Sequence, residues 1–71
     1  MDNIDLLKAK MHREPFRPFL IEFISGAQIL IDADTEILFP HKRPELVIAF
    51  TGNGLMHEFE GRAITRLVEA T

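Results

Sequence analysis

The sequence of 71 residues contains no cysteine, tryptophan or tyrosine, and Ser25 is its only serine. Without cysteine, neither a disulfide nor a thiolate metal site can form, and the absence fits a reducing compartment. Ser25 stands in a predicted turn without the glycine pattern or the paired base that activates a nucleophile, so the chain shows no machinery for acyl transfer. Oligomerisation is the device that remains for stabilising so small a domain.

Long apolar runs and an excess of positive charge are also missing. No run approaches the roughly 18 apolar residues of a membrane span, and the acidic start at residues 1–5 is unlike a signal peptide. We therefore expect a cytoplasmic protein with no membrane partner. The net charge of −3 disfavours tight, sequence-independent binding to nucleic acid, because such affinity depends on lysine and arginine.

What the chain has in abundance is apolar side chains. They make up 46% of the residues and include six phenylalanines, which is ample for a folded core. We expect a single domain over residues 1–71, of the size at which folding buries only about 60% of the unfolded surface. A second copy of the chain is therefore a candidate cover for part of the apolar surface.

A helix is predicted at the start of the chain, over residues 3–13. Apolar residues at spacings of three and four share one face of it, and Asp2 or Asn3 provides the N-cap. The segment Glu14–Phe19 ends the helix, because each of its two prolines forces the residue before it into an extended conformation.

The rest of the chain, about residues 19–70, is patterned as short strands separated by turns. Five main strands are predicted at 19–24, 28–32, 46–50, 55–60 and 65–69. The polar stretch 32–36 is either a turn or a bent continuation of the second strand into 37–39. Residues 62–64 fit a single helical turn before the last strand.

These elements predict an α+β fold, in which an N-terminal helix packs on a strongly bent five-stranded antiparallel sheet or small barrel. The predicted core consists of Leu7, Phe19, Ile21, Phe23, Ile29, Ile31, Val47, Phe50, Phe59, Ile64 and Leu67.

The order of elements resembles the small barrels of the Sm/Hfq-like and SH3-like type. The ending Arg62–Val68 is similar to the close of Hfq-type Sm domains, where a short basic-Ala-Ile-Ser/Thr stretch enters the last strand. In addition, the motif Pro15–Phe19, with the sequence Pro-Phe-Arg-Pro-Phe, followed by a small-Gly turn resembles a group of short uncharacterised bacterial proteins. Many of those proteins carry Asp-Gly where this chain has Ser25-Gly26. This resemblance covers most of the chain and implies a small β-rich domain, but no function.

Eight residues are candidates for an interaction surface. Arg17 between Phe16 and Phe19 has the pattern of a stacking platform for bases or partner side chains, although burial of both rings where the helix meets the sheet is the favoured interpretation. The basic cluster 41–43 is a candidate anion site, for which a solvated loop is the favoured alternative. The basic members of the set are Arg17, His41, Lys42, Arg43, Arg62 and Arg66.

Other polar groups give weaker signals. On an extended strand, Asp32, Asp34 and Glu36 would share one face and offer oxygen ligands to a divalent cation, but the spacing of a calcium loop is missing and a solvated acidic edge is favoured. The three histidines are isolated, which argues against a metal site. We predict no catalytic residue, metal or cofactor. A ligand pocket would need Glu22, Asp32 or His57 to converge.

The sequence therefore favours a non-enzymatic function. We expect a small protein-interaction or self-assembling module, which forms a homo-oligomer through strand edges or the apolar helix face, or binds another protein. The alternative is an Sm-like RNA-binding protein, in which a ring assembly concentrates the six basic residues on one face.

Overall fold

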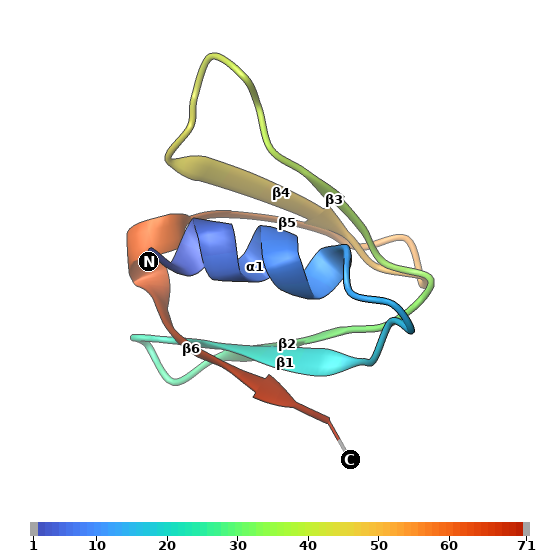
Figure 1. Ribbon diagram of the computed structural model, residues 1–71. Coiled ribbons are helices and arrows are strands. Elements are labelled where there is room, and N and C mark those ends of the chain that lie inside the picture. Colours follow the sequence, from blue (N-terminus) through green and yellow to red (C-terminus); the bar gives the residue numbers. More distant parts are fainter. Residues whose placement is uncertain (1, 71) are drawn as a thin grey trace.

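A computed structural model describes residues 2–70 of the chain. Two antiparallel sheets of three strands each, with the orders β2-β1-β6 and β3-β4-β5, lie on either side of the helix α1 (Figure 1). The α+β class predicted from the sequence is therefore confirmed. The elements are α1 (Asn3–Met11), β1 (Phe19–Phe23), β2 (Gln28–Ile31), β3 (Glu36–Leu38), β4 (Leu46–Phe50), β5 (Met56–Glu60), the 3₁₀ helix η1 (Gly61–Ala63) and β6 (Ile64–Glu69).

The predicted single sheet of five strands is wrong: residues 2–70 form six strands in two sheets and no closed barrel. The division falls at residues 32–35, where a turn separates β2 from β3. Asp32 Oδ1 accepts hydrogen bonds from the Asp34 backbone N–H at 3.0 Å and from the Thr35 hydroxyl at 3.1 Å. Because the Asp32 carboxylate closes this turn, the chain leaves β1, and β3 pairs with β4 instead.

Helix α1 ends at Met11, two residues before the predicted end. The Asp2 carboxylate caps its first turn by accepting a hydrogen bond from the Asp5 backbone N–H at 2.9 Å. Leu7 is fully buried, and the Asn3 side-chain amide donates to the Ile64 carbonyl at 2.8 Å. The start of the helix is therefore fixed against the start of β6.

The core lies between the two sheets and α1. Six predicted members are buried, and a further four pack half-buried against them. Phe50 is the exception: in β4, Val47 and Ala49 point inward and are fully buried, so Phe50, an odd number of positions from Val47, points to the outer face. The buried members are Leu7, Phe19, Ile21, Ile31, Val47 and Ile64, and the half-buried ones are Phe23, Ile29, Phe59 and Leu67.

The two predicted hairpin turns are confirmed. Gly26, between β1 and β2, has φ +92°, and Gly54, between β4 and β5, has φ +87°, a conformation that favours glycine. No helix within residues 2–70 is long and apolar enough to cross a membrane. The cytoplasmic location stays a prediction.

Candidate interaction surfaces

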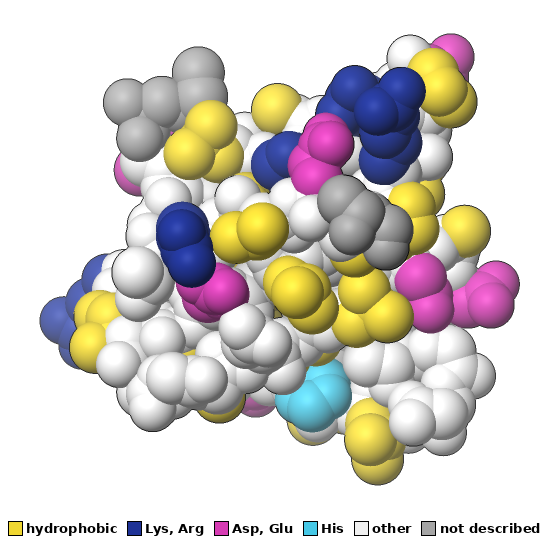
Figure 2. Space-filling model, turned by 90° about the horizontal axis from the view of Figure 1, so that it is seen from below, with side chains coloured by type: hydrophobic (Ala, Val, Ile, Leu, Met, Phe, Trp, Pro, Cys, Tyr) yellow, Lys and Arg dark blue, Asp and Glu magenta, His cyan; other side chains and the backbone are white. Residues whose placement is uncertain are grey.

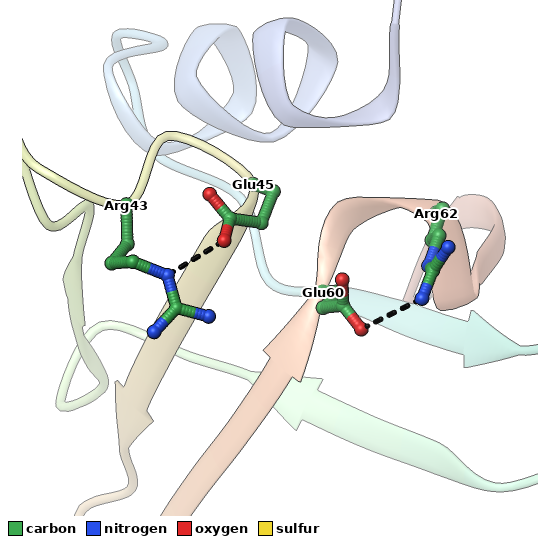
Figure 3. A network of polar contacts seen from close by, with 4 residues as sticks. All are labelled: Arg43, Glu45, Glu60 and Arg62. Atoms are coloured by element: carbon green, nitrogen blue, oxygen red, sulfur yellow. Dashed lines mark hydrogen bonds and ion pairs between the residues drawn. The ribbon is translucent and has the colours of Figure 1, made fainter.

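Basic residues of the β3–β4 loop and of η1 lie at one end of the molecule, but the arginines there are held by carboxylates. Arg43 Nε donates to Glu45 Oε2 at 2.7 Å, and Arg62 Nη2 donates to Glu60 Oε2 at 3.3 Å (Figure 3). The hydrogen bond from Arg43 to Glu45 raises the pKa of the Arg43 guanidinium. Residues 41–42 are exposed in the same loop. Both arginines therefore already have an anionic partner, which weakens this end as a phosphate site.

The remaining basic candidates lie elsewhere. Arg66 projects from the outer face of β6 and forms an ion pair with Glu22 of the neighbouring β1. Arg17 precedes β1, whose first residue pairs with the end of β6, whereas Arg62 precedes the start of β6. From its first to its last residue, β6 spans about 17 Å. A single copy of the chain therefore places Arg17 and Arg62 near opposite ends of β6 and does not bring them together.

The aromatic pair around Arg17 is part of the packing between helix and sheet. Phe19 is only 1% exposed and belongs to the core, because β1 begins there and the side chain points inward with that of Ile21. Phe16 is half-buried against the core, and its ring centroid lies 6.3 Å from that of Phe19. Phe19 is thus not available on the surface, and the arrangement matches the favoured interpretation, in which both rings close the junction.

A hollow of about 530 Å³ lies between the β2–β3 turn and the β4–β5 turn. Asp32 and His57 both line it, but Glu22 does not: it lies on the outer face of β1, where Gln28 Nε2 donates to its carboxylate at 2.8 Å. The hydrogen bond from Arg66 lowers the pKa of Glu22. Two of the three titratable groups named for a ligand pocket, Asp32 and His57, therefore line the same hollow, and Glu22 lies outside it.

The acidic series 32–36 does not form a ladder of carboxylates. Asp32 and Asp34 lie in the β2–β3 turn, so they do not share a strand face with Glu36, which begins β3. The Asp32 carboxylate is already an acceptor for two groups of its own turn. Within the described part of the chain, no three side chains of the metal-ligating types come together.

The outer face of the β2-β1-β6 sheet carries a row of apolar side chains. Leu20 of β1 is paired with Leu30 of β2 on one side and with Val68 of β6 on the other, so the three side chains are neighbours across the sheet. Leu30 is 49% exposed. Figure 2 shows hydrophobic side chains gathered in the middle of this face. We call the face the β1 outer face; it also contains the polar row Gln28, Glu22 and Arg66.

The outer face of the other sheet is apolar along β4 and acidic at its margins. Leu38 and Met56 are 47% and 58% exposed, and the side chains of Ile48 and Phe50 lie half-buried between them. We call this surface the β4 outer face. It consists of Glu36 and Leu38 of β3, Leu46, Ile48 and Phe50 of β4, and Met56, Glu58 and Glu60 of β5.

Neither outer face was predicted from the sequence, although a signal for both is present. The runs Gln28–Ile31 and Leu46–Phe50 contain apolar residues at consecutive positions rather than in alternation. A strand of this kind places apolar side chains on both faces of its sheet, as in strands that are covered on both sides. No protein-family model matches this chain, and no curated protein or solved structure matches it at a significant level.

Proposed function

We propose that the chain is a non-enzymatic protein-interaction module that self-associates through the β1 outer face. One observation carries the proposal: Leu20, Leu30 and Val68 form an apolar row across three neighbouring strands, and nothing within residues 2–70 covers it fully. Exposed apolar rows of this kind, with polar residues beside them, are characteristic of association sites.

The charges on this face favour a second copy as the partner. Beside the apolar row, Arg66 and Gln28 both bond to the Glu22 carboxylate, so the polar row is neutralised internally. A two-fold axis perpendicular to β1, along the apolar row, would place Leu20, Leu30 and Val68 each against its own equivalent and the polar rows of the two copies on opposite sides of the apolar row. Apolar groups would then meet apolar groups, and each Glu22 would keep its own cation.

The proposal extends to the fold type. If β2 and β3 are counted as one strand interrupted at residues 32–35, the strand order is β6-β1-β2/β3-β4-β5, with a 3₁₀ turn before the last strand. This order supports a relationship to the Sm-like and SH3-like small barrels, as an open form. RNA binding, the alternative function, has less support, because Arg43, Arg62 and Arg66 are each paired with a glutamate.

Sedimentation velocity of the wild type and of the variant Leu30→Glu tests the proposal. The row is much smaller than the ~800 Å² per partner of a standard interface, so we expect weak association that is visible only at high protein concentration. The average mass of the wild type should rise from 8.1 kDa toward twice that value, whereas Leu30→Glu should stay monomeric.

The matched control is Leu38→Glu, which introduces the same charge at a leucine of similar exposure on the opposite outer face. It should associate like the wild type. A wild type that stays at 8.1 kDa at every concentration, or equal loss of association in both variants, would contradict the proposal.

A further inference from the structure

The β4 outer face is an apolar surface with the sequence pattern of a covered one. All five residues of β4 are apolar, and those that do not face the core, Leu46, Ile48 and Phe50, line the middle of the outer face. Leu38 of β3 and Met56 of β5 extend this surface to either side, opposite Ile48 and Phe50. A strand apolar on both faces is typical of a sheet that has a layer on each side.

The border of this surface is negatively charged. Glu36 stands opposite Phe50, and Glu58 stands opposite Ile48, on the same face. None of the ion pairs among residues 2–70 involves either carboxylate. Glu60, the third glutamate on the face, is paired with Arg62, whose side chain is 84% exposed. The apolar centre is thus bordered by two carboxylates that form no ion pair within residues 2–70, of which Glu58 still acts on the charge of Arg43 from a distance.

These charges argue against a second copy as the occupant. Any two-fold face-to-face dimer would bring six glutamates into one interface, because each copy contributes Glu36, Glu58 and Glu60. In one arrangement β4 lies antiparallel on β4 of the second copy and β5 lies on β5, so that Glu58 would face Glu58. In the other arrangement β3 lies on β5 of the second copy, so that Leu38 would face Glu58. Like charges that face each other across an interface are costly, and so is a carboxylate buried against a leucine.

We propose that the β4 outer face binds an amphipathic helix of another protein, with an apolar stripe that packs on Leu38, Ile48, Phe50 and Met56 and with lysines or arginines that pair with Glu36 and Glu58. This inference rests on the proposed function as a protein-interaction module. From Leu46 to Phe50 the strand spans about 13 Å, which matches two to three turns of a helix. A helix layer on this sheet would complete the covering that the composition of β4 favours.

The probe is a labelled synthetic peptide with leucines at spacings of three and four and lysines at the flanking positions, titrated with the full chain by fluorescence anisotropy. A second peptide carries glutamate in place of lysine, and a third has the composition of the first in scrambled order. Only the first should bind, and its affinity should fall as salt is raised from about 50 to about 500 mM. Equal binding of the lysine and glutamate peptides, or of the scrambled one, would overturn the proposal, as would no binding.

Two variants locate the site. Leu38→Gln removes apolar contact, and Glu58→Gln removes charge; each should weaken binding of the lysine peptide by about fivefold or more. Their matched controls are Leu30→Gln on the β1 outer face and Glu14→Gln in the segment after α1, which should leave the affinity unchanged. All four positions are exposed, so the four variants should fold like the wild type, and circular dichroism checks this.

Equal affinity of the wild type and of both Leu38→Gln and Glu58→Gln would overturn the inference. The self-association test is separate, because it depends on Leu30 and not on Leu38. A wild type that dimerises but does not bind the peptide refutes the helix site and leaves the proposed function in place. A chain that binds the peptide through Leu38 and Glu58 but never dimerises supports the helix site and refutes the β1 interface.

Discussion

Gly61 is the residue on which the close packing of α1 against η1 depends most directly. It is buried, and a Cβ atom added to it would lie 2.5 Å from Ile4 Cγ1 and 2.7 Å from Ile4 Cδ1. The Gly61 backbone N–H also donates to the Glu45 carbonyl at 2.9 Å, which joins η1 to the residue before β4. Any side chain at this position must therefore displace Ile4 or η1.

We expect Gly61→Ala to lower the free energy of unfolding by about 1–3 kcal/mol, the usual cost of overpacking. The three atoms nearest to the added methyl group all belong to Ile4. The loss of unfolding free energy caused by Gly61→Ala should therefore be smaller when Ile4→Ala is already present. Urea denaturation of the two single variants and the double variant measures this coupling.

Gly26→Ala is the control, since its cost comes from a φ of +92° and no atom lies near the added Cβ. Its destabilisation should be the same with and without Ile4→Ala. Full additivity of Gly61→Ala with Ile4→Ala would show that the two residues do not compete for the same space.

The orientation of single residues in β4 shows where sequence analysis reaches its limit. Val47 and Phe50 were both predicted to be in the core, but residues three apart on a strand point to opposite faces. Since all five residues of the strand are apolar, no polar residue marks which face is outside. The inner positions of β1 could be predicted, because Glu22 interrupts the apolar run and identifies the outer face.

At the scale of elements, ion pairs with Glu69 connect α1 to β6. Arg13, two residues after the end of the helix, donates to the Glu69 carboxylate, and Lys10 Nζ in the last turn of α1 lies 3.9 Å from the same oxygen. The hydrogen bond from Arg13, followed by the charges of Arg13, Lys10 and Arg17, lowers the pKa of Glu69 below its ordinary value of 4.5. The ionised Glu69 carboxylate therefore favours the folded state. Its contribution to stability is fully present at pH values above the pKa that Glu69 has in the unfolded chain.

We expect the stability difference between the wild type and Glu69→Gln to depend on pH. The difference in the free energy of unfolding should be largest at about pH 7. It should disappear as the pH falls below about 4.5 and then through the lowered pKa of Glu69 in the folded state. Urea denaturation of both proteins from about pH 7 to about pH 3 measures it. The effect should be small and should decrease further at about 1 M salt, because the pair is exposed. A difference that does not change with pH would contradict this assignment.

Element boundaries were predictable where turn residues mark them. The turns at Gly26 and Gly54 were expected, because glycine and asparagine favour these conformations. The helical turn before β6 was expected at residues 62–64 and lies one residue earlier, at Gly61–Ala63. The division into two sheets was not expected, because the polar stretch 32–36 allowed both a bend and a turn. The choice depends on hydrogen bonds to the Asp32 carboxylate, which composition does not reveal.

At the scale of the whole molecule, the two sheets expose two outer faces with different charge. The β1 outer face is neutral, since Glu22 and Arg66 pair across neighbouring strands, whereas the β4 outer face keeps Glu36 and Glu58 without an ion pair among residues 2–70. Glu22 and Arg66 are 44 positions apart in the sequence, and they meet only because of the register between β1 and β6. The sequence therefore revealed the basic residues but not their neutralisation.

The two faces allow two partners at once, because they belong to different sheets, which lie on either side of α1. We expect the lysine peptide to bind equally well to the wild type and to the monomeric Leu30→Glu variant. Fluorescence anisotropy at protein concentrations above and below the dimerisation range measures this independence. Loss of peptide binding in Leu30→Glu, with the fold intact by circular dichroism, would show that the faces are coupled.

The claim that the β1 outer face joins two copies is tested most directly by NMR spectra of the ¹⁵N-labelled chain over a dilution series. We predict that the amide signals of Leu20, Leu30 and Val68 and of their neighbours in β1, β2 and β6 shift with concentration, while those of β3 and β4 do not. Spectra that are identical at all concentrations, or shifts confined to β3 and β4, would contradict the account.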